Sequence, residues 1–238
     1  MEKKTLDEYV KTFTSCFKKL CKKEMEKGKG KEGDVLKREA RLLDLRYRLS
    51  LDLRVGIETE YSSTKGNDVR ETYELIFKFM DLWNVYEACQ RYGQKLSVFP
   101  TEKDAPKKWD AAFLKNNGLV DCLEKQAESF KKQFLSTESN RQKYIKYLGH
   151  FAGLDAISKG NKKKYKKYIN ADVKAFDYEQ LLFIQYMERN AFYHGGETAK
   201  SEVGYAYRKK LLKFYIDFLK QFIALLGVQL FTIDMTKQ

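Results

Sequence analysis

An arginine, an asparagine and a histidine lie close together near the end of a predicted helix, at Arg189, Asn190 and His194. A histidine changes protonation near neutral pH and can therefore take or give a proton. An arginine stays charged and offers a fork of N–H donors to phosphate oxygens, and an asparagine amide can bind a phosphate or orient an imidazole. Cleavage of a phosphodiester needs proton transfer and a cation beside the developing charge. These side chains therefore predict phosphodiester chemistry.

The stretch around these residues reads Met-Glu-Arg-Asn-Ala-Phe-Tyr-His-Gly over residues 187–195. It resembles the Arg-x(4–6)-His signature of the HEPN superfamily, in which the residue after the arginine is polar and often asparagine. In that family the signature also lies late in a helix, and a long amphipathic helix follows it. The likeness is close over the motif and loose over residues 138–233.

The resemblance implies a fold and an activity. The fold would be an all-α helical bundle, and the activity would be RNA cleavage without a metal. His194 would transfer protons, Arg189 would contact the phosphate, and Asn190 would orient the reacting groups. Because the chain carries one such motif, the resemblance implies a homodimer or higher homo-oligomer with a composite site, and products with a 2′,3′-cyclic phosphate and a 5′-hydroxyl. It also implies a role in prokaryotic defence, as a toxin, an abortive-infection effector or a CRISPR accessory, with an antitoxin or CRISPR effector as a further partner.

Three other interpretations of the motif stay open. Arg189 and His194 could simply pair with neighbouring carboxylates such as Glu188 or Glu197. The chain could instead be a non-nucleolytic HEPN-like accessory protein that acts by oligomer assembly, with assembly at a membrane as one form. It could also be a plain helical nucleic-acid-binding module in which the motif is incidental. The other histidine, His150, has no arginine at the right distance upstream, so we expect it to pack in the core.

A group of basic residues supports a nucleic-acid partner. Tyr165 and Tyr168 are interleaved with five lysines, namely Lys162, Lys163, Lys164, Lys166 and Lys167. Lysines neutralise phosphates and tyrosines can stack on unpaired bases, so this segment predicts contact with single-stranded RNA. The alternative is a solvated loop or short helix. A net charge of +13 suits a polyanionic partner, although a lysine-rich surface without such a role gives the same balance.

The hydrophobic pattern predicts an all-α fold. Apolar residues at spacings of three and four predict helices over residues 5–26, 68–93, 108–115, 119–135, 140–157, 177–194 and 199–231. The intervening residues 94–108 and 158–176 are predicted to be irregular, the second as a basic loop. Residues 35–61 are ambiguous, since strict alternation over residues 43–57 favours a strand and the composition of residues 36–42 favours a helix. We expect a helix buried on two faces there, with a strand as the alternative.

The chain is predicted to divide at the polar loop near residue 137. Residues 1–137 would form a helical N-terminal region without an assigned function. Residues 138–238 would form the HEPN-like domain that carries the motif. The boundary rests on the capping residues between two predicted helices, Ser136-Thr137-Glu138-Ser139-Asn140.

The remaining composition predicts a cytoplasmic protein without a cofactor. None of the four cysteines, Cys16, Cys21, Cys89 and Cys122, forms a CxxC pair, so we expect no metal and no cofactor. Free thiols and an N-terminus without a secretory signal predict a reducing cytoplasm. The last predicted helix is strongly apolar, but Lys213, Asp217 and Lys220 interrupt it. Because a charge near the centre of a bilayer costs about 2.5–3.5 kcal/mol, we expect a buried helix and not a membrane span.

Overall fold

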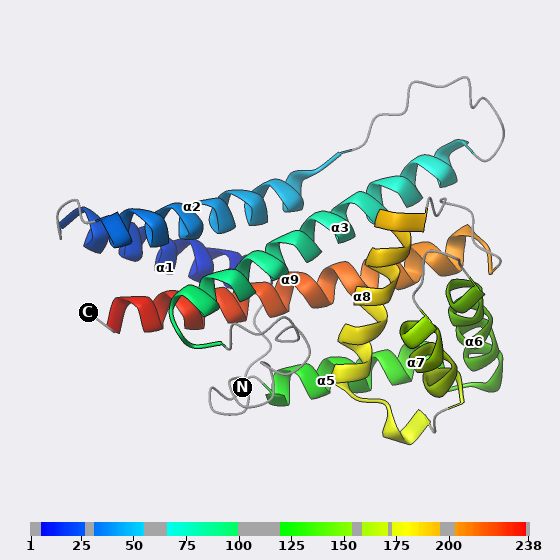
Figure 1. Ribbon diagram of the computed structural model, residues 1–238. Coiled ribbons are helices and arrows are strands. Elements are labelled where there is room, and N and C mark those ends of the chain that lie inside the picture. Colours follow the sequence, from blue (N-terminus) through cyan, green and yellow to red (C-terminus); the bar gives the residue numbers. More distant parts are fainter. Residues whose placement is uncertain are drawn as a thin grey trace. The chain divides into compact units, whose positions relative to one another are not determined.

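The computed structural model describes residues 6–26, 31–54, 66–99, 120–153, 159–170, 173–195 and 203–236. Regular structure in these ranges is helical throughout, without a strand, which confirms the predicted all-α class (Figure 1). The α-helices are α1 (Leu6–Glu26), α2 (Lys31–Asp52), α3 (Gly66–Lys95), α5 (Val120–Phe130), α6 (Glu138–Gly153), α7 (Lys159–Ile169), α8 (Tyr178–Gly195) and α9 (Tyr205–Thr236). A π-helical turn, Lys131–Leu135, extends α5, and a 3-10 turn, Val173–Ala175, precedes α8. The helix predicted over residues 108–115 lies outside the described ranges.

The ambiguous segment is helical in its described part. Helix α2 runs through residue 52, so the strand alternative is wrong over residues 43–52, and residues 55–57 lie outside the described ranges. Burial on two faces is also wrong. Leu43, Tyr47 and Ser50 are buried on one side, whereas Leu45 and Leu49 are exposed. The alternation in the sequence therefore combines two sets of apolar residues, one on the buried face of the helix and one on its exposed face.

By their contacts, the residues fall into two compact units, each assembled from segments far apart in the sequence. Unit 1 contains residues 1–53, 81–120 and 217–238, and unit 2 contains residues 54–80 and 121–216. Both units draw on residues before and after position 137. These units are defined by packing alone. The division into two functional regions at residue 137 stays a prediction.

Unit 1 has an aromatic core around Phe13 of α1. The ring of Phe13 lies 4.8 Å from that of Tyr47 on α2 and 5.3 Å from that of Phe231 on α9. Helix α9 approaches α1 closely at Gly227, where an added Cβ would lie 2.3 Å from the Phe13 ring. Polar links accompany this packing, since the Tyr47 hydroxyl donates to the Lys220 carbonyl at 3.0 Å. The apolar stripe predicted for the first helix is thus the buried face of α1.

Unit 2 has its own aromatic core around Phe130 of α5. Its ring lies 5.4 Å from that of Tyr144 on α6, 5.0 Å from that of Phe176 before α8, and 5.3 Å from that of Phe214 on α9. The loop that the sequence places near residue 137 forms the cap of α6, because the Asn140 amide donates to Thr137 Oγ1 at 3.2 Å. Helices α5, α6 and α9 therefore contribute aromatic rings to one apolar centre.

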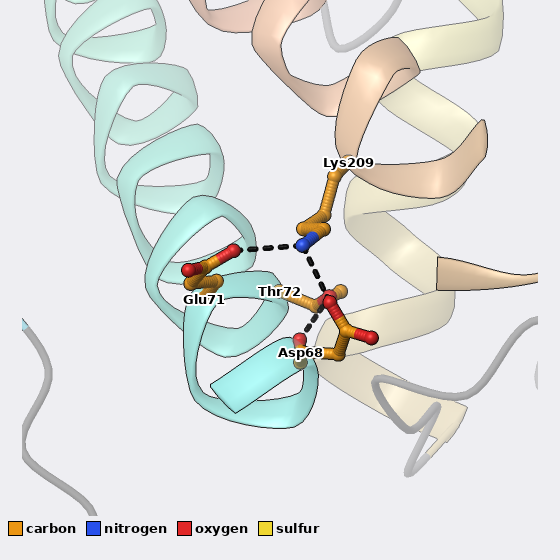
Figure 2. A network of polar contacts seen from close by, with 4 residues as sticks. All are labelled: Asp68, Glu71, Thr72 and Lys209. Carbon is orange, nitrogen blue, oxygen red and sulfur yellow. Dashed lines mark hydrogen bonds and ion pairs between the residues drawn. The ribbon is translucent and has the colours of Figure 1, made fainter. Parts of the chain in front are cut away.

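A polar network at the start of α3 links it to α9 within unit 2. Figure 2 shows Lys209 Nζ between two carboxylates, 2.7 Å from Asp68 Oδ1 and 2.7 Å from Glu71 Oε2. The Thr72 hydroxyl donates to the Asp68 carbonyl at 2.6 Å. The hydrogen bond from Lys209 and its positive charge lower the pKa of Glu71, and the hydrogen bonds from Lys209 to both carboxylates raise the pKa of Lys209.

Replacing Lys209 with glutamine is expected to give a small loss of thermal stability that disappears in acid. A carboxyl whose pKa is lower in the folded chain stabilises the fold above its unfolded pKa, and this effect is lost as pH falls through the folded pKa. The contribution from the raised pKa of Lys209 is lost only at strongly alkaline pH. Lys209→Gln should therefore melt about 1–3 °C below wild type at neutral pH. Lys143→Gln on the exposed side of α6 is the control, and a difference that persists undiminished at pH of about 3 would contradict the assignment.

Helix α9 is long and apolar enough to cross a membrane by length and composition alone. Its most apolar window has a mean hydropathy of 1.5, and 56% of that window is buried within the structure. The core helix of a globular protein can be equally long and apolar. Helix α9 supplies core residues to both units, among them Leu212, Tyr215, Phe222 and Phe231. Its burial is compatible with the predicted core role.

Candidate active site

Helix α8 carries the motif, and its sequence explains where it begins and which side it buries. The Gln180 amide donates to Asp177 Oδ1 at 2.8 Å, so Asp177 caps the helix. Apolar residues at spacings of three and four face the core, namely Leu181, Ile184, Met187 and Ala191. The helix ends at Gly195, as the sequence predicts. The motif therefore occupies the last two turns of a capped, well-packed helix.

The Arg189 guanidinium is held by two neighbours on the same helix. Its Nη1 donates to Asn190 Oδ1 at 3.0 Å, and its Cζ lies 4.8 Å from the centroid of the Tyr193 ring. Arg189 and Asn190 are both half-buried, and Tyr193 is 61% exposed. The structure thus brings together two of the three predicted catalytic residues and keeps the cation beside solvent.

His194 lies in the last turn of α8, and its side chain lies outside what the structure describes. The register of the helix still relates the three positions. At about 100° per residue, positions 190 and 194 differ by about 40° around the axis, whereas positions 189 and 194 differ by about 140°. Asn190 therefore shares a helix face with position 194, and Arg189 shares one with Tyr193.

Glu188, immediately before the motif arginine, is fully buried. Its two carboxylate oxygens accept hydrogen bonds from Tyr147 of α6 at 3.0 Å and from Tyr215 of α9 at 3.1 Å. Burial, and then the charge of Glu188, raise the pKa values of Tyr144, Tyr165 and Tyr215 well above the ordinary value. Glu188 therefore lies in the core of unit 2, where both of its carboxylate oxygens accept hydrogen bonds from tyrosines of other helices. Glu197, the other carboxylate of the interpretation in which the motif cations pair with neighbours, lies outside the described residues.

A buried arginine packs against the motif from α9. The Cζ of Arg208 lies 4.8 Å from the ring centroid of Phe192 and 5.9 Å from that of Phe151. Phe192 thus packs inward while Tyr193 is exposed. His150, in the last turn of α6, is half-buried with its ring 5.5 Å from that of Phe151. Sequence reasoning missed Arg208, since the residues around it are typical of a solvent-exposed, basic first turn of a helix.

The predicted RNA-binding lysines lie on α7, a helix, in a region that the hydrophobic pattern predicts as a basic loop and for which a short helix is the alternative. Lysine favours helices, and the tyrosines supply an inward stripe at a spacing of three. Tyr165 is fully buried, and the Tyr168 ring lies 5.2 Å from that of Phe183 on α8. The expectation of base stacking is therefore wrong for Tyr165, and for the half-buried Tyr168 it stays a prediction. Four of the lysines are exposed, Lys163, Lys164, Lys166 and Lys167, and Lys162 is half-buried.

The cysteines that the structure describes are unreactive in type. Burial raises the pKa of Cys16 on α1 and, more strongly, that of the fully buried Cys89 on α3. A thiol with a raised pKa carries little thiolate at neutral pH and is a poor nucleophile. The polar groups of α8 and α7 are therefore the stronger candidates for chemistry.

Comparison of the chain with protein-family models, with curated proteins and with solved structures finds no match. The assignment of a function therefore depends on the motif and its surroundings.

Proposed function

We propose that this chain is a metal-independent RNA endonuclease of the HEPN type, active in a prokaryotic defence or toxin system, with a composite site between two copies. The observation that carries the proposal is the Arg189 guanidinium, held half-exposed by Asn190 and Tyr193 in the same two turns of helix that end at His194. A fixed cation beside solvent suits a phosphate, and the adjacent histidine position suits proton transfer.

The reaction would proceed with the RNA as its own nucleophile. His194 of one copy would take the proton from the 2′-hydroxyl, and the 2′-oxygen would attack phosphorus. The bond from phosphorus to the 5′-oxygen would break, and His194 of the second copy would protonate that oxygen. The products would be a 2′,3′-cyclic phosphate and a 5′-hydroxyl. The two Arg189 guanidinium groups would neutralise the charge that develops on the phosphate.

Helix register favours two copies over one. Positions 189 and 194 of a single helix point about 140° apart, so one chain does not present its arginine and its histidine from the same face. Two copies related by a two-fold axis repeat each position across the interface. An arginine from one copy can then act beside the histidine of the other.

The test is cleavage of labelled single-stranded RNA by the purified protein in EDTA. Wild type should cut and leave cyclic phosphate ends, and His194→Ala, purified in the same way, should not cut. Size-exclusion chromatography with light scattering should show at least a dimer. If neither protein cuts and the oligomer is larger than a dimer, the proposal fails in favour of an assembly role. In that case binding of the oligomer to lipid vesicles would test whether the apolar helix α9 acts at a membrane.

The exposed lysines of α7 are proposed to hold the RNA through its phosphates, since Tyr165 is fully buried and Tyr168 packs against Phe183. Lys163→Gln/Lys166→Gln/Lys167→Gln should weaken RNA binding and reduce the slope of log affinity against log salt by about 2, because each phosphate contact on a single strand contributes about 0.7. Fluorescence anisotropy over a salt series measures this. The matched control removes three exposed lysines of α1, Lys11, Lys19 and Lys22, and should keep the wild-type slope. Equal slopes in the two triple variants would contradict a role for α7.

A further inference from the structure

Helix α2 presents a stripe of leucines to solvent. Leu42 is 38% exposed, Leu45 is 46% exposed and Leu49 is 58% exposed. Their spacings of three and four residues place them on one line along the helix. The opposite side of α2 is buried in unit 1 through Leu43 and Tyr47. The helix therefore has a packed inner face and a second apolar face that the described part of the chain leaves uncovered.

Arginines flank this stripe in a regular pattern. In a heptad repeat labelled from a to g, Leu42 and Leu49 can be assigned to position a and Leu45 to position d. Arg41 and Arg48 then fall at position g, and Arg46 falls at position e. In paired helices, residues at e and g lie beside the apolar seam and select the partner by charge. Arg38, at the preceding d position, is also exposed. We call the three leucines with these four arginines the α2 seam.

Acidic residues of unit 1 moderate this charge without cancelling it. Arg48 forms an ion pair with the buried Asp44 at 2.5 Å. Burial raises the pKa of Asp81 on α3, and the nearby positive charge of Arg46 opposes that rise. Arg38 and Arg41 lie on the same side as the leucines, as does Asp52 at the far end, and Glu39 occupies the e position before Arg46, where it pairs with Lys95 at 2.8 Å. The α2 seam is thus apolar along its centre, with three arginines and one glutamate along its edges.

We propose that the α2 seam binds an amphipathic helix of another protein, with apolar residues at spacings of three and four and Glu or Asp beside them. The seam extends over about two heptads, which sets the length of the partner helix. A second copy of this chain is a poor occupant, because pairing two seams would oppose arginines to arginines. A membrane surface is also disfavoured, since the stripe is narrow and contains no Trp, Tyr or Phe of the kind that anchors interfacial helices. The proposal does not depend on nuclease activity.

The probe is a synthetic, fluorescein-labelled peptide of about three heptads with Leu at a and d and Glu at e and g, which repels itself at neutral pH. The comparison peptide has Lys at e and g. Anisotropy titration of the full chain should show binding of the Glu peptide at least about tenfold tighter than binding of the Lys peptide, with affinity falling as salt rises.

Variants assign the binding to this surface. Leu45→Gln/Leu49→Gln should weaken binding of the Glu peptide by about tenfold or more, since buried leucine surface is lost from the complex. Phe77→Gln, which alters another exposed apolar residue on α3, should bind as wild type does. Arg38→Glu/Arg41→Glu should reverse the preference towards the Lys peptide. Circular dichroism should show the same helix content in all variants.

Several outcomes overturn the proposal. One is equal or absent binding of the two peptides. Another is a wild-type oligomer that Leu45→Gln/Leu49→Gln dissociates, which makes a second copy the occupant. A third is binding to vesicles of equimolar phosphatidylcholine and phosphatidylserine that the same variant abolishes, with no peptide binding. The last is a clear fall in melting temperature for that variant without peptide binding, which means that the chain itself covers the seam.

Discussion

Glu188→Ala is expected to lower the free energy of unfolding by about 3–5 kcal/mol. Glu188 is fully buried and accepts hydrogen bonds from the Tyr147 and Tyr215 hydroxyls. Alanine leaves a cavity, and it leaves two buried hydroxyls without their acceptor. Each unsatisfied hydroxyl costs about 1–3 kcal/mol. Urea unfolding at constant pH, followed by circular dichroism, measures this decrease in the free energy of unfolding. If the two units unfold in separate transitions, the transition of unit 2 should be the one that shifts.

Glu188→Gln gives a graded comparison, because its amide oxygen can still accept one of the two hydrogen bonds. Its loss should be about half that of alanine or less. Glu179→Ala is the matched control, since Glu179 is exposed in the first turn of the same helix and should change the stability little. A loss below about 1 kcal/mol for Glu188→Ala would mean that the tyrosines find other partners at no cost.

His194→Ala is expected to reduce the rate of RNA cleavage by about 10²–10⁴, the usual size of a general acid–base contribution. Arg189→Ala should cause a comparable loss, because it removes charge stabilisation at the phosphate. Arg189→Lys should recover little, since lysine keeps the charge but lacks the fork of donors and the stacking on Tyr193. Single-turnover rates with excess protein measure the effect without a contribution from product release.

His150→Gln is the matched control for His194→Ala, since it removes the chain's other histidine. His150 packs beside Phe151, so cleavage should stay within a few-fold of wild type. Equal losses in the two histidine variants, with unchanged circular dichroism, would show that proton transfer is not specific to position 194. Wild-type cleavage that His194→Ala retains in full would remove the basis of the proposed mechanism.

The sequence predicted both α1 and α2 as helices, but it predicted their burial well only in α1, where one apolar face repeats. The stripe of α1 led directly to its core contacts at Phe13. In α2, an alternating pattern arises because Leu43 and Tyr47 face the core while Leu45 and Leu49 face solvent. The spacing of apolar residues shows which of them share a helix face, but whether other parts of the protein cover that face depends on tertiary contacts.

The site was predictable only in its local part. The glycines that follow His194 are enough to indicate the end of α8, and the link between Arg189 and Asn190 follows from their adjacency. The partners of Glu188 come from two other helices, and no spacing within one segment reveals them. The tyrosines of α7 misled for the same reason, because an aromatic residue among lysines can stack on a base or fill a core.

The buried carboxylate beside the motif also sets the rotational register of α8. Turning this helix by one residue, about 100°, in one direction would move Glu188 into the half-exposed place of Arg189, away from its tyrosine donors, and in the other direction would move Arg189 into the buried place of Glu188. Rotating a helix away from its native register costs much free energy when a buried polar group loses its partners. The cost is smaller when only apolar residues of similar shape exchange places. Drift of the neighbouring surface residues over evolution would then leave the direction of the guanidinium unchanged, as long as position 188 stays acidic and its tyrosine donors remain.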